Sequence, residues 1–273
     1  MKIIPCPSSP LLARRIAEKA GLEIGNVVFK KFPDGELYVR VDERGECLVV
    51  GSINTNDDLV ALALTLDAVE RARVVVPYMG YARQDRAFDA GEAVSIRVVA
   101  EILERKAEEV ITVNIHSKQA ASHFRKLKDL DAMPLIGKHF ADRDVVMISP
   151  DKGSVERVKT AAKFANCEWD YLEKMRIDAT TVEIAPKNID VENRNVVIVD
   201  DIISTGGTVV EAAKRLYELG ARSVSATCVH GVLADFAAIK LFNAGIKEVI
   251  ATDTVECAFS GISVAELIAK NIS

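Results

Sequence analysis

One stretch of the sequence decides the fold: Val196-Val197-Ile198-Val199-Asp200-Asp201-Ile202-Ile203-Ser204-Thr205-Gly206-Gly207-Thr208. Its first four residues are apolar and β-branched, which predicts a buried strand. Two carboxylates follow, and a turn of small residues then leads into a periodic segment that begins at Val209 and predicts a helix. Such a joint offers backbone N–H groups and the positive end of the helix dipole to an anion. Because carboxylates accept hydrogen bonds from sugar hydroxyls, the stretch predicts a ligand with a phosphate and a nearby diol.

The same stretch has a second interpretation that involves no ligand. Thr208-Val209-Val210-Glu211 fits a capping box, in which two side chains satisfy the backbone at the start of a helix. The glycines alone favour this plainer interpretation, because similar joints occur in α/β proteins that bind no phosphate. The paired aspartates directly after an apolar strand favour ligand binding for the stretch as a whole.

Strand-like and helix-like segments alternate along the chain. Buried strands are predicted at 74–77, 109–115, 144–149, 195–199, 223–229 and 248–251, and helices at 57–70, 95–105, 154–165, 209–219 and 234–243. This alternation predicts an α/β fold of mainly parallel sheets flanked by helices, with ligands at the carboxyl ends of the strands. The two halves of the chain share this plan, which predicts one domain at 1–141 and a second at 142–273.

The first part of the chain carries two further local signals. Ser9 as a possible cap and Pro10 in the first turn predict the start of a helix, which Gly21 ends. Farther along, residues 27–30 and 37–41 resemble two strands. The turn signal Pro-Asp-Gly within Phe32-Pro33-Asp34-Gly35-Glu36 predicts a hairpin loop between them.

Bulk composition narrows the possible functions. The chain has 273 residues, of which 49% are apolar, and a formal net charge of −5. This charge, with no dense basic run, argues against a nucleic-acid binder. The five cysteines are odd in number and form no C-x-x-C pair, which argues against a zinc site or a disulfide framework. With no signal-like segment and no apolar run of membrane-spanning length, we expect a cytoplasmic protein without membrane contact.

Polar segments close several other predicted strands. Tyr81-Ala82-Arg83-Gln84-Asp85-Arg86 is rich in arginine, which suits phosphate contacts, although the hexapeptide alone fits a solvated loop better. His116 follows another strand, where it could hold a metal, act as a base or only satisfy backbone groups. Because Asp151 closes the next strand, His116 and Asp151 could share a Mg²⁺ ion that bridges phosphates. No ligand role is expected of the remaining histidines, His123, His139 and His230.

Lys174 and Arg176 form a cationic pair two positions apart. From an extended strand, their side chains could point the same way. A pair of this kind can stabilise the charge that develops on a phosphoryl group during transfer. An exposed basic strand edge explains the pair equally well.

Taken together, these elements resemble the ribose-phosphate pyrophosphokinases, also called phosphoribosyl pyrophosphate (PRPP) synthetases. The resemblance covers nearly the whole chain and keeps the motifs in order. It implies two type I phosphoribosyltransferase-like domains, with the ATP side in 1–141 and the ribose 5-phosphate side in 142–273. It also implies a homo-oligomer, because the family's Phe32–Glu36 loop reaches the ATP site of a neighbouring subunit.

The resemblance assigns a role to each motif. It implies catalytic roles for Lys174 and Arg176 on the family's flexible loop, and magnesium binding by His116 and Asp151. The implied ATP-binding residues are Phe32, Asp34, Glu36, Arg83, Gln84, Asp85 and His116. The implied ribose-5-phosphate-binding residues are Asp200, Asp201, Ser204, Thr205, Gly206, Gly207 and Thr208.

The chain departs from the family pattern at a few positions. Asn114 stands where the family often has aspartate, and the phosphate loop reads Ser-Thr-Gly-Gly-Thr instead of Asp-Thr-Ala-Gly-Thr. Ser204 removes one negative charge beside the phosphate and makes the loop similar to that of type I phosphoribosyltransferases. The chain is also shorter than the allosterically controlled members, which puts phosphate and ADP regulation in doubt.

The implied reaction transfers the diphosphoryl group of ATP to the 1-hydroxyl of ribose 5-phosphate and gives PRPP and AMP. A type I phosphoribosyltransferase, which consumes PRPP, is the second hypothesis. It does not need the Phe32–Glu36 loop or the arginine-rich segment. A catalytically silent protein that regulates an active synthetase is the third, and the presence of both predicted metal ligands and both loop cations argues against it.

Overall fold

The computed structural model describes residues 1–176 and 182–272, with only the backbone described at 174–176 and 182–185. Its contacts divide the chain into two compact units. Unit 1 contains Met1–Asp131, Thr254–Glu256 and Ser263–Ser273, and unit 2 contains Ala132–Asp253 and Cys257–Ile262.

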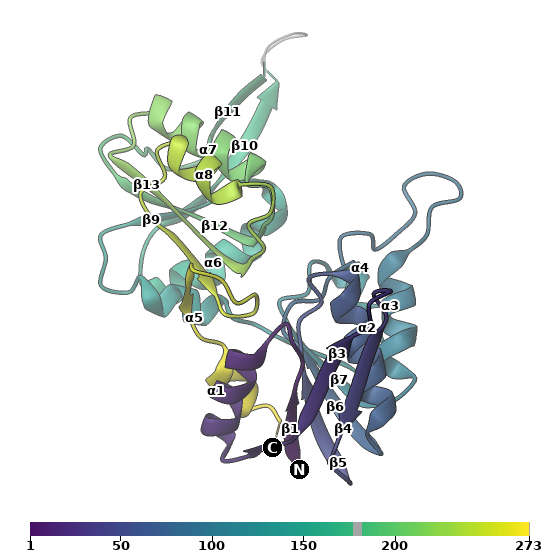
Figure 1. Cartoon of the computed structure of the whole chain (residues 1–273). Coiled ribbons are helices and arrows are strands. Elements are labelled where there is room, and N and C mark those ends of the chain that lie inside the picture. Colours follow the sequence, from purple (N-terminus) through teal and green to yellow (C-terminus); the bar gives the residue numbers. More distant parts are fainter. Residues whose placement is uncertain (177–181, 273) are drawn as a thin grey trace. The chain divides into compact units, whose positions relative to one another are not determined.

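Unit 1 is built on a six-stranded parallel sheet. The strand order is β2 (Glu23–Ile24), β1 (Lys2–Pro5), β5 (Glu46–Val50), β6 (Arg71–Val76), β7 (Ala107–Val113) and β8 (Leu127–Leu130). Figure 1 shows α2 (Asn56–Ala68) and α3 (Ser95–Glu104) over one face and α1 (Pro10–Ala20) over the other. The predicted strands and helices of this region are confirmed, with ends shifted by a few residues.

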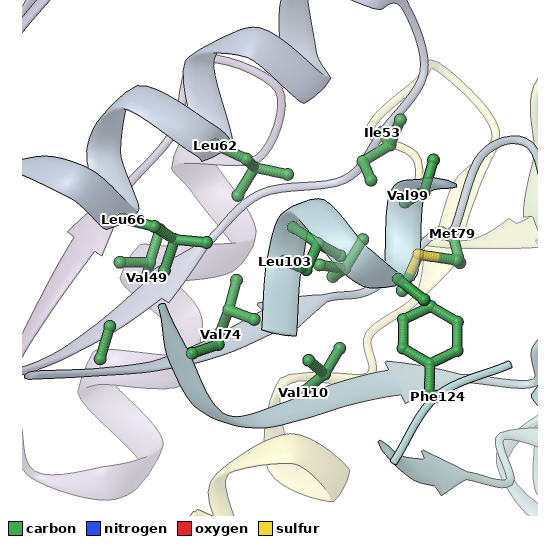
Figure 2. Close-up of a cluster of buried hydrophobic side chains, with 14 of the residues drawn as sticks. Val49, Ile53, Leu62, Leu66, Val74, Met79, Val99, Leu103, Val110 and Phe124 are labelled. Carbon is green, nitrogen blue, oxygen red and sulfur yellow. The ribbon is translucent and has the colours of Figure 1, made fainter. Parts of the chain in front are cut away.

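Apolar side chains from the sheet and two helices form the core of unit 1. Figure 2 shows valines of β5, β6 and β7 in one buried cluster with leucines of α2 and α3: Val49, Val74, Val110, Leu62, Leu66 and Leu103. These three valines lie in strands and these three leucines in helices, as their conformational preferences favour. This core fixes the sheet whose carboxyl edge carries the polar loops.

The predicted hairpin forms a separate two-stranded antiparallel sheet of β3 (Val27–Lys31) and β4 (Leu37–Val41). Gly35 in the connecting loop has φ +98°, a conformation that side chains disfavour. The Phe32 N–H donates to the Glu36 carbonyl at 2.8 Å and closes the turn. The Pro-Asp-Gly signal is therefore confirmed.

Unit 2 contains a seven-stranded sheet that is parallel except for its first strand pair. The strand order is β11 (Val182–Pro186), β10 (Trp169–Arg176), β9 (Val146–Ser149), β12 (Asn195–Ile203), β13 (Ser223–Gly231), β14 (Val249–Thr252) and β15 (Ser260–Ile262). The apolar residues of α7 (Gly207–Glu218) and α8 (Ala237–Asn243) form a core with one sheet face. In Figure 1, α5 (Met133–His139) and α6 (Val155–Ala165) lie over the other face.

The division by contacts differs from the boundary that the sequence predicted at 141/142. Helix α5 belongs to unit 2, while the chain after Ile262 returns to unit 1. There α9 (Ala265–Ala269) packs against α1. Arg73 Nη2 donates to the Ile272 carbonyl at 2.7 Å, and Lys128 Nζ donates to the Asn271 carbonyl at 2.9 Å. A boundary placed by segment order alone cannot detect this return.

The start of α1 also differs from expectation. Ser9 occupies the cap position, but its hydroxyl makes no cap and instead accepts from the Ser52 N–H at 3.0 Å. Glu256, far along the chain, accepts from the Leu12 N–H at 2.5 Å. A carboxylate at a helix N-terminus is also favoured by the helix dipole, so this contact stabilises α1 from a distant part of unit 1.

Candidate active site

The two aspartates of the deciding stretch lie within β12, which continues to Ile203 instead of ending at Val199. Asp201 is buried, with 5% of its surface exposed, and Asp200 is half-buried. Burial and the adjacent charge of Asp201 raise the pKa of Asp200 from its ordinary value to about 8. Two neighbouring carboxylates that lose water therefore resist ionising together.

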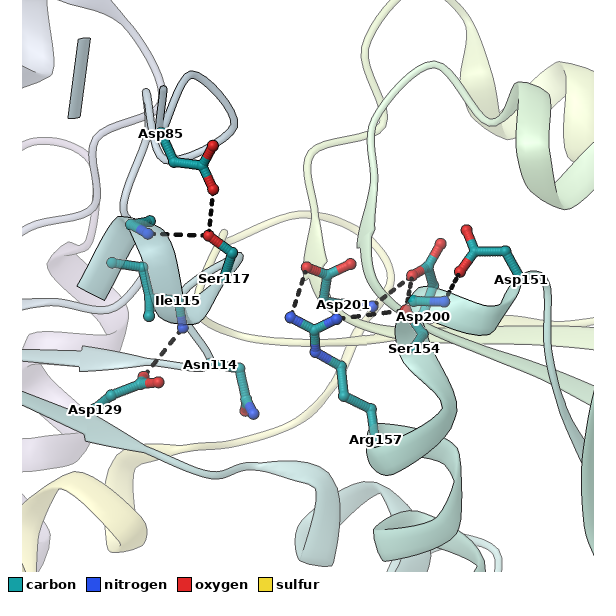
Figure 3. A network of polar contacts seen from close by, with 12 residues as sticks. Asp85, Asn114, Ile115, Ser117, Asp129, Asp151, Ser154, Arg157, Asp200 and Asp201 are labelled. Atoms are coloured by element: carbon teal, nitrogen blue, oxygen red, sulfur yellow. Dashed lines mark hydrogen bonds and ion pairs between the residues drawn. The ribbon is translucent and has the colours of Figure 1, made fainter. Parts of the chain in front are cut away.

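Groups from the start of α6 hold this acidic pair, as Figure 3 shows. The Ser154 hydroxyl donates to Asp200 Oδ1 at 3.1 Å, and the Asp201 N–H donates to the same oxygen at 2.8 Å. Arg157 Nη2 lies 3.2 Å from Asp201 Oδ2 and forms an ion pair with it. Ser154 and Arg157 were not singled out by the sequence, because their partners lie more than forty positions away in the chain.

The phosphate-loop candidate, Ser204–Thr208, leads directly into α7. Gly206 is the N-cap residue of α7 with φ +79°, and no side chain caps this helix. The capping box predicted as the alternative, Thr208 to Glu211, is therefore not formed. A Cβ placed on Gly207 would meet no atom within 4 Å, so the space beside the first turn is open. Open space at an uncapped helix N-terminus suits an anion.

Asp151 lies between β9 and α6, on the turn that carries Ser154. Its Oδ1 accepts from the Gly153 N–H at 2.7 Å, and it caps the short 3-10 helix Lys152–Ser154. The carboxylate is exposed. One short segment of unit 2 thus presents Asp151 to solvent and holds the acidic pair of β12.

In unit 1, hydrogen bonds of its own polar groups hold the arginine-rich segment after β6 against neighbouring loops. Gln84 Nε2 donates to the Glu92 carboxylate at 3.0 Å. Asp85 Oδ2 accepts from the Ser117 hydroxyl at 2.5 Å, and the Asp85 carbonyl contacts His123 Nε2 at 2.8 Å. Arg83 is exposed. Of the three residues predicted here to bind ATP, Gln84 and Asp85 thus also hold the loop in place.

His116 follows β7 on a segment that two carboxylates near the end of β8 support. Asp129 Oδ1 accepts from the Ile115 N–H at 3.0 Å, and Asp131 Oδ1 accepts from the Asn114 side-chain amide at 2.9 Å. Asn114 has φ +41°, in the left-handed region that asparagine tolerates better than most residues. Asn114, which departs from the family pattern, therefore has a hydrogen-bond partner in Asp131. Neither Asp129 nor Asp131 was singled out from the sequence, because each acts on a residue more than ten positions away in the chain.

The loop Phe32–Glu36, predicted to bind ATP, stands at the tip of the β3–β4 hairpin. Phe32, Asp34 and Glu36 are all exposed. The Phe32 ring makes an edge-to-face contact with Tyr38 at 6.2 Å between centroids, and Asp34 Oδ1 accepts from the Glu36 N–H at 3.2 Å. The tip is thus braced locally and remains accessible to a planar ligand.

Lys174 and Arg176 belong to β10, where their backbone pairs with Ile184 and Val182 of β11. This extended backbone is the condition under which their side chains could point the same way. Their side chains lie outside the described residues, so the predicted catalytic roles stay predictions.

Within the described ranges, no group of three or more His, Cys, Asp and Glu residues gathers around a possible metal position. Mg²⁺ in phosphate-transfer sites often uses one or two protein ligands, with water and substrate oxygens completing its shell. The exposed carboxylate of Asp151 fits that requirement.

No described helix has the length and apolar character needed to cross a bilayer.

Two family models match the chain. Residues 1–107 match the N-terminal domain of ribose phosphate pyrophosphokinase, and residues 126–240 match a phosphoribosyl transferase domain. Ribose-phosphate pyrophosphokinase 2 of Archaeoglobus fulgidus is 77% identical over 272 residues, covering 100% of both chains. The ribose-phosphate pyrophosphokinase of Methanosarcina mazei is 44% identical, covering 100% of this chain and 95% of its own length.

A solved structure also matches the fold of the chain. The crystal structure of phosphoribosylpyrophosphate synthetase from Mycobacterium smegmatis has a TM-score of 0.85 and 29% identity, covering 99% of this chain and 97% of its own. The predicted fold, two mainly parallel sheets flanked by helices, is confirmed. The chain belongs to the ribose-phosphate pyrophosphokinase family.

Proposed function

We propose that the chain transfers the diphosphoryl group of ATP to the 1-hydroxyl of ribose 5-phosphate and forms PRPP and AMP. The observation that carries this proposal is the uncapped N-terminus of α7 directly after the acidic end of β12. This joint offers N–H donors for a phosphate and carboxylate acceptors for a diol, the two ends of ribose 5-phosphate. The full-length identity to named ribose-phosphate pyrophosphokinases supports the same reaction.

The acceptor sugar binds in unit 2. The backbone of Ser204–Thr208 receives the 5-phosphate, and Gly206 and Gly207 let that backbone come close to it. Asp200 and Asp201 accept hydrogen bonds from the ribose hydroxyls. Binding both ends of the sugar fixes the direction of its 1-hydroxyl, which is the main contribution that positioning makes to a phosphoryl-type transfer.

The donor, ATP, uses residues of unit 1. Phe32, Asp34 and Glu36 contact the adenine end, while Arg83, Gln84 and Asp85 lie along the phosphates together with His116. His116 and Asp151 stay the predicted ligands of Mg²⁺. When bound, Mg²⁺ neutralises charge on the phosphate oxygens.

In the transfer, the 1-oxygen of ribose 5-phosphate forms a bond to the β-phosphorus of ATP. The bond from that phosphorus to the oxygen bridging the α-phosphate breaks, and AMP leaves with this oxygen. The hydroxyl proton passes to water. Lys174 and Arg176 stabilise the negative charge that spreads over the transferring group.

The proposal also covers the oligomeric state and the cellular location of the enzyme, both of which follow the family pattern. The accessible tip of the β3–β4 hairpin, Phe32–Glu36, reaches the ATP site of a second copy, so the enzyme works as a homo-oligomer. The enzyme acts in the cytoplasm, with no nucleic-acid or membrane partner.

Product analysis tests the proposed reaction. Protein, ATP, Mg²⁺ and ribose 5-phosphate are mixed, and the products are identified by phosphorus NMR. We expect AMP and PRPP in equal amounts. Formation of ADP, or no turnover, contradicts the reaction. PRPP consumption with a nucleobase, in the absence of PRPP synthesis, identifies a phosphoribosyltransferase instead.

Replacing Lys174 tests its predicted catalytic role. Lys174→Ala removes the positive charge that is proposed to stabilise the transferring group, so turnover should fall about 100- to 1000-fold. ATP affinity, measured by calorimetry, should stay within a few-fold of the unaltered protein, because the charge acts on the transition state. Lys163→Ala, an exposed lysine on α6, is the control and should keep full turnover. Near-normal turnover of Lys174→Ala would contradict the predicted catalytic role of Lys174.

Asp200→Asn tests the electrostatic cost of the acidic pair. The pKa of Asp200 rises to about 8 in the folded chain, so the folded protein binds this proton more tightly than the unfolded chain does. The carboxyl therefore destabilises the fold increasingly as the pH rises from about 4 to 8, and fully above that range. Asn removes the charge and keeps an oxygen that accepts from Ser154, so the melting temperature should exceed that of the unaltered protein near pH 8.5 but not near pH 4.

The same variant should bind ribose 5-phosphate less well. Near pH 8.5, where Asp200 is ionised, loss of the charged acceptor should reduce kcat/KM for ribose 5-phosphate about 10- to 100-fold. The exposed Asp142→Asn serves as the control, and its stability and kinetics should follow the unaltered protein. A stability difference that does not change with pH contradicts the assigned electrostatic cost.

A further inference from the structure

We infer that Arg157 is a positioning residue for the acceptor sugar, holding Asp201 directly and Asp200 through Ser154. This inference rests on the proposed function, because it takes the acidic pair of β12 as the binding site of the ribose hydroxyls. It assigns a role to a residue on α6 that lies outside the predicted ligand-binding motifs.

Arg157 reaches both carboxylates with one side chain. Its Nη2 lies 3.2 Å from Asp201 Oδ2, and its Nη1 donates to the Ser154 hydroxyl at 3.4 Å. That hydroxyl donates in turn to Asp200 Oδ1 at 3.1 Å. Figure 3 shows the guanidinium between Asp201 and Ser154. The contacts form one continuous network from the first helical turn of α6 to the end of β12.

Burial makes this network selective for arginine. The side chain of Arg157 is 20% exposed and that of Asp201 is 7% exposed, so water contributes little to either charge. An ionised carboxylate at this depth needs a charged partner. The guanidinium has a planar fork with separate N–H donors, whereas a lysine ammonium is a compact charge on a flexible stem. Lysine can therefore replace the ion pair to Asp201 but not the link to Ser154.

The position of Arg157 along the chain extends this role. Asp151, Ser154 and Arg157 lie on one short segment that runs from the 3-10 helix Lys152–Ser154 into α6. The segment that presents the predicted magnesium ligand therefore also orients the sugar-binding carboxylates. A sugar bound to the acidic pair therefore has a fixed position relative to the segment that carries Asp151.

Loss of Arg157 should act on the acceptor and not on the donor. Without the guanidinium, Asp201 loses its ion pair with Arg157, and the Ser154 hydroxyl that donates to Asp200 loses its contact with Arg157. The two carboxylates are then less firmly oriented toward a diol. Arg157 belongs to unit 2, whereas the residues assigned to ATP belong to unit 1, so ATP binding should be preserved.

The test measures ribose 5-phosphate and ATP separately in the full-length protein. Arg157→Ala, Arg157→Lys and Ser154→Ala are compared with Arg194→Ala, whose guanidinium forms a more exposed ion pair with Glu168 at 2.6 Å. Steady-state kinetics give KM for each substrate and kcat. Calorimetry with ribose 5-phosphate alone gives its affinity without any turnover.

We expect Arg157→Ala to weaken ribose 5-phosphate binding and raise its KM at least about tenfold, with KM for ATP within twofold. Arg157→Lys should recover part of the loss, and Ser154→Ala should lose less than Arg157→Ala. Arg194→Ala should match the unaltered protein. If Arg157→Ala does not fold, Arg157→Lys and Ser154→Ala still give the comparison, because each keeps part of the network.

Three outcomes overturn the inference. In the first, ribose 5-phosphate affinity changes by less than twofold in every Arg157 and Ser154 variant. In the second, both KM values rise together, or only the folded fraction falls, which indicates a merely structural role. In the third, the unaltered protein does not bind ribose 5-phosphate at all. Failure of the proposed reaction is distinct from these, since it appears as absent PRPP synthesis while ribose 5-phosphate still binds and responds to Arg157.

Discussion

Two carboxyl groups lie side by side in β12, and the surrounding chain has to limit the cost of ionising both. Their repulsion and loss of water raise the pKa of Asp200, while Asp201 is paired with a guanidinium. A buried acidic pair is costly for stability, and such costs are typical of functional sites. In the proposed function, a diol that donates hydrogen bonds to both carboxylates relieves this cost when it binds. The architecture of unit 2, from the core beneath β12 to the helix start that supplies Ser154 and Arg157, keeps this pair in place.

Unit 1 uses carboxylates differently, as braces for its loops. Asp85 links the arginine-rich segment to Ser117, and Asp129 holds the segment before His116. These contacts join the loops that follow β6 and β7 into one polar network at the carboxyl edge of the sheet. Such bracing is physically useful near phosphates, because charged loops placed in advance need not reorganise when the ligand arrives. Arg83 stays exposed and available as a cation.

Local pattern was enough to predict much of this protein. The alternation of apolar segments predicts the parallel sheets, and Pro-Asp-Gly predicts the hairpin, because both signals act over a few residues. The partners of the key groups were not predictable in this way. Arg157 reaches Asp201, and Glu256 replaces Ser9 at the start of α1, through contacts that only the folded chain creates. Thr208–Glu211 matched a capping box, yet the helix starts at Gly207 with Gly206 as its cap residue. The order of the polar motifs indicated the family, while their supports came from tertiary structure.

In the proposed function, the loop after β12 and the acidic pair together bind ribose 5-phosphate. The most direct measurement follows the backbone amide resonances of the full-length protein by NMR as ribose 5-phosphate is added without ATP. We expect saturable shifts at Gly206, Gly207 and Thr208 and at Asp200 and Asp201, with the amides of the hairpin tip Phe32–Glu36 unchanged. Shifts confined to unit 1, or no saturable shift at the start of α7, would contradict it.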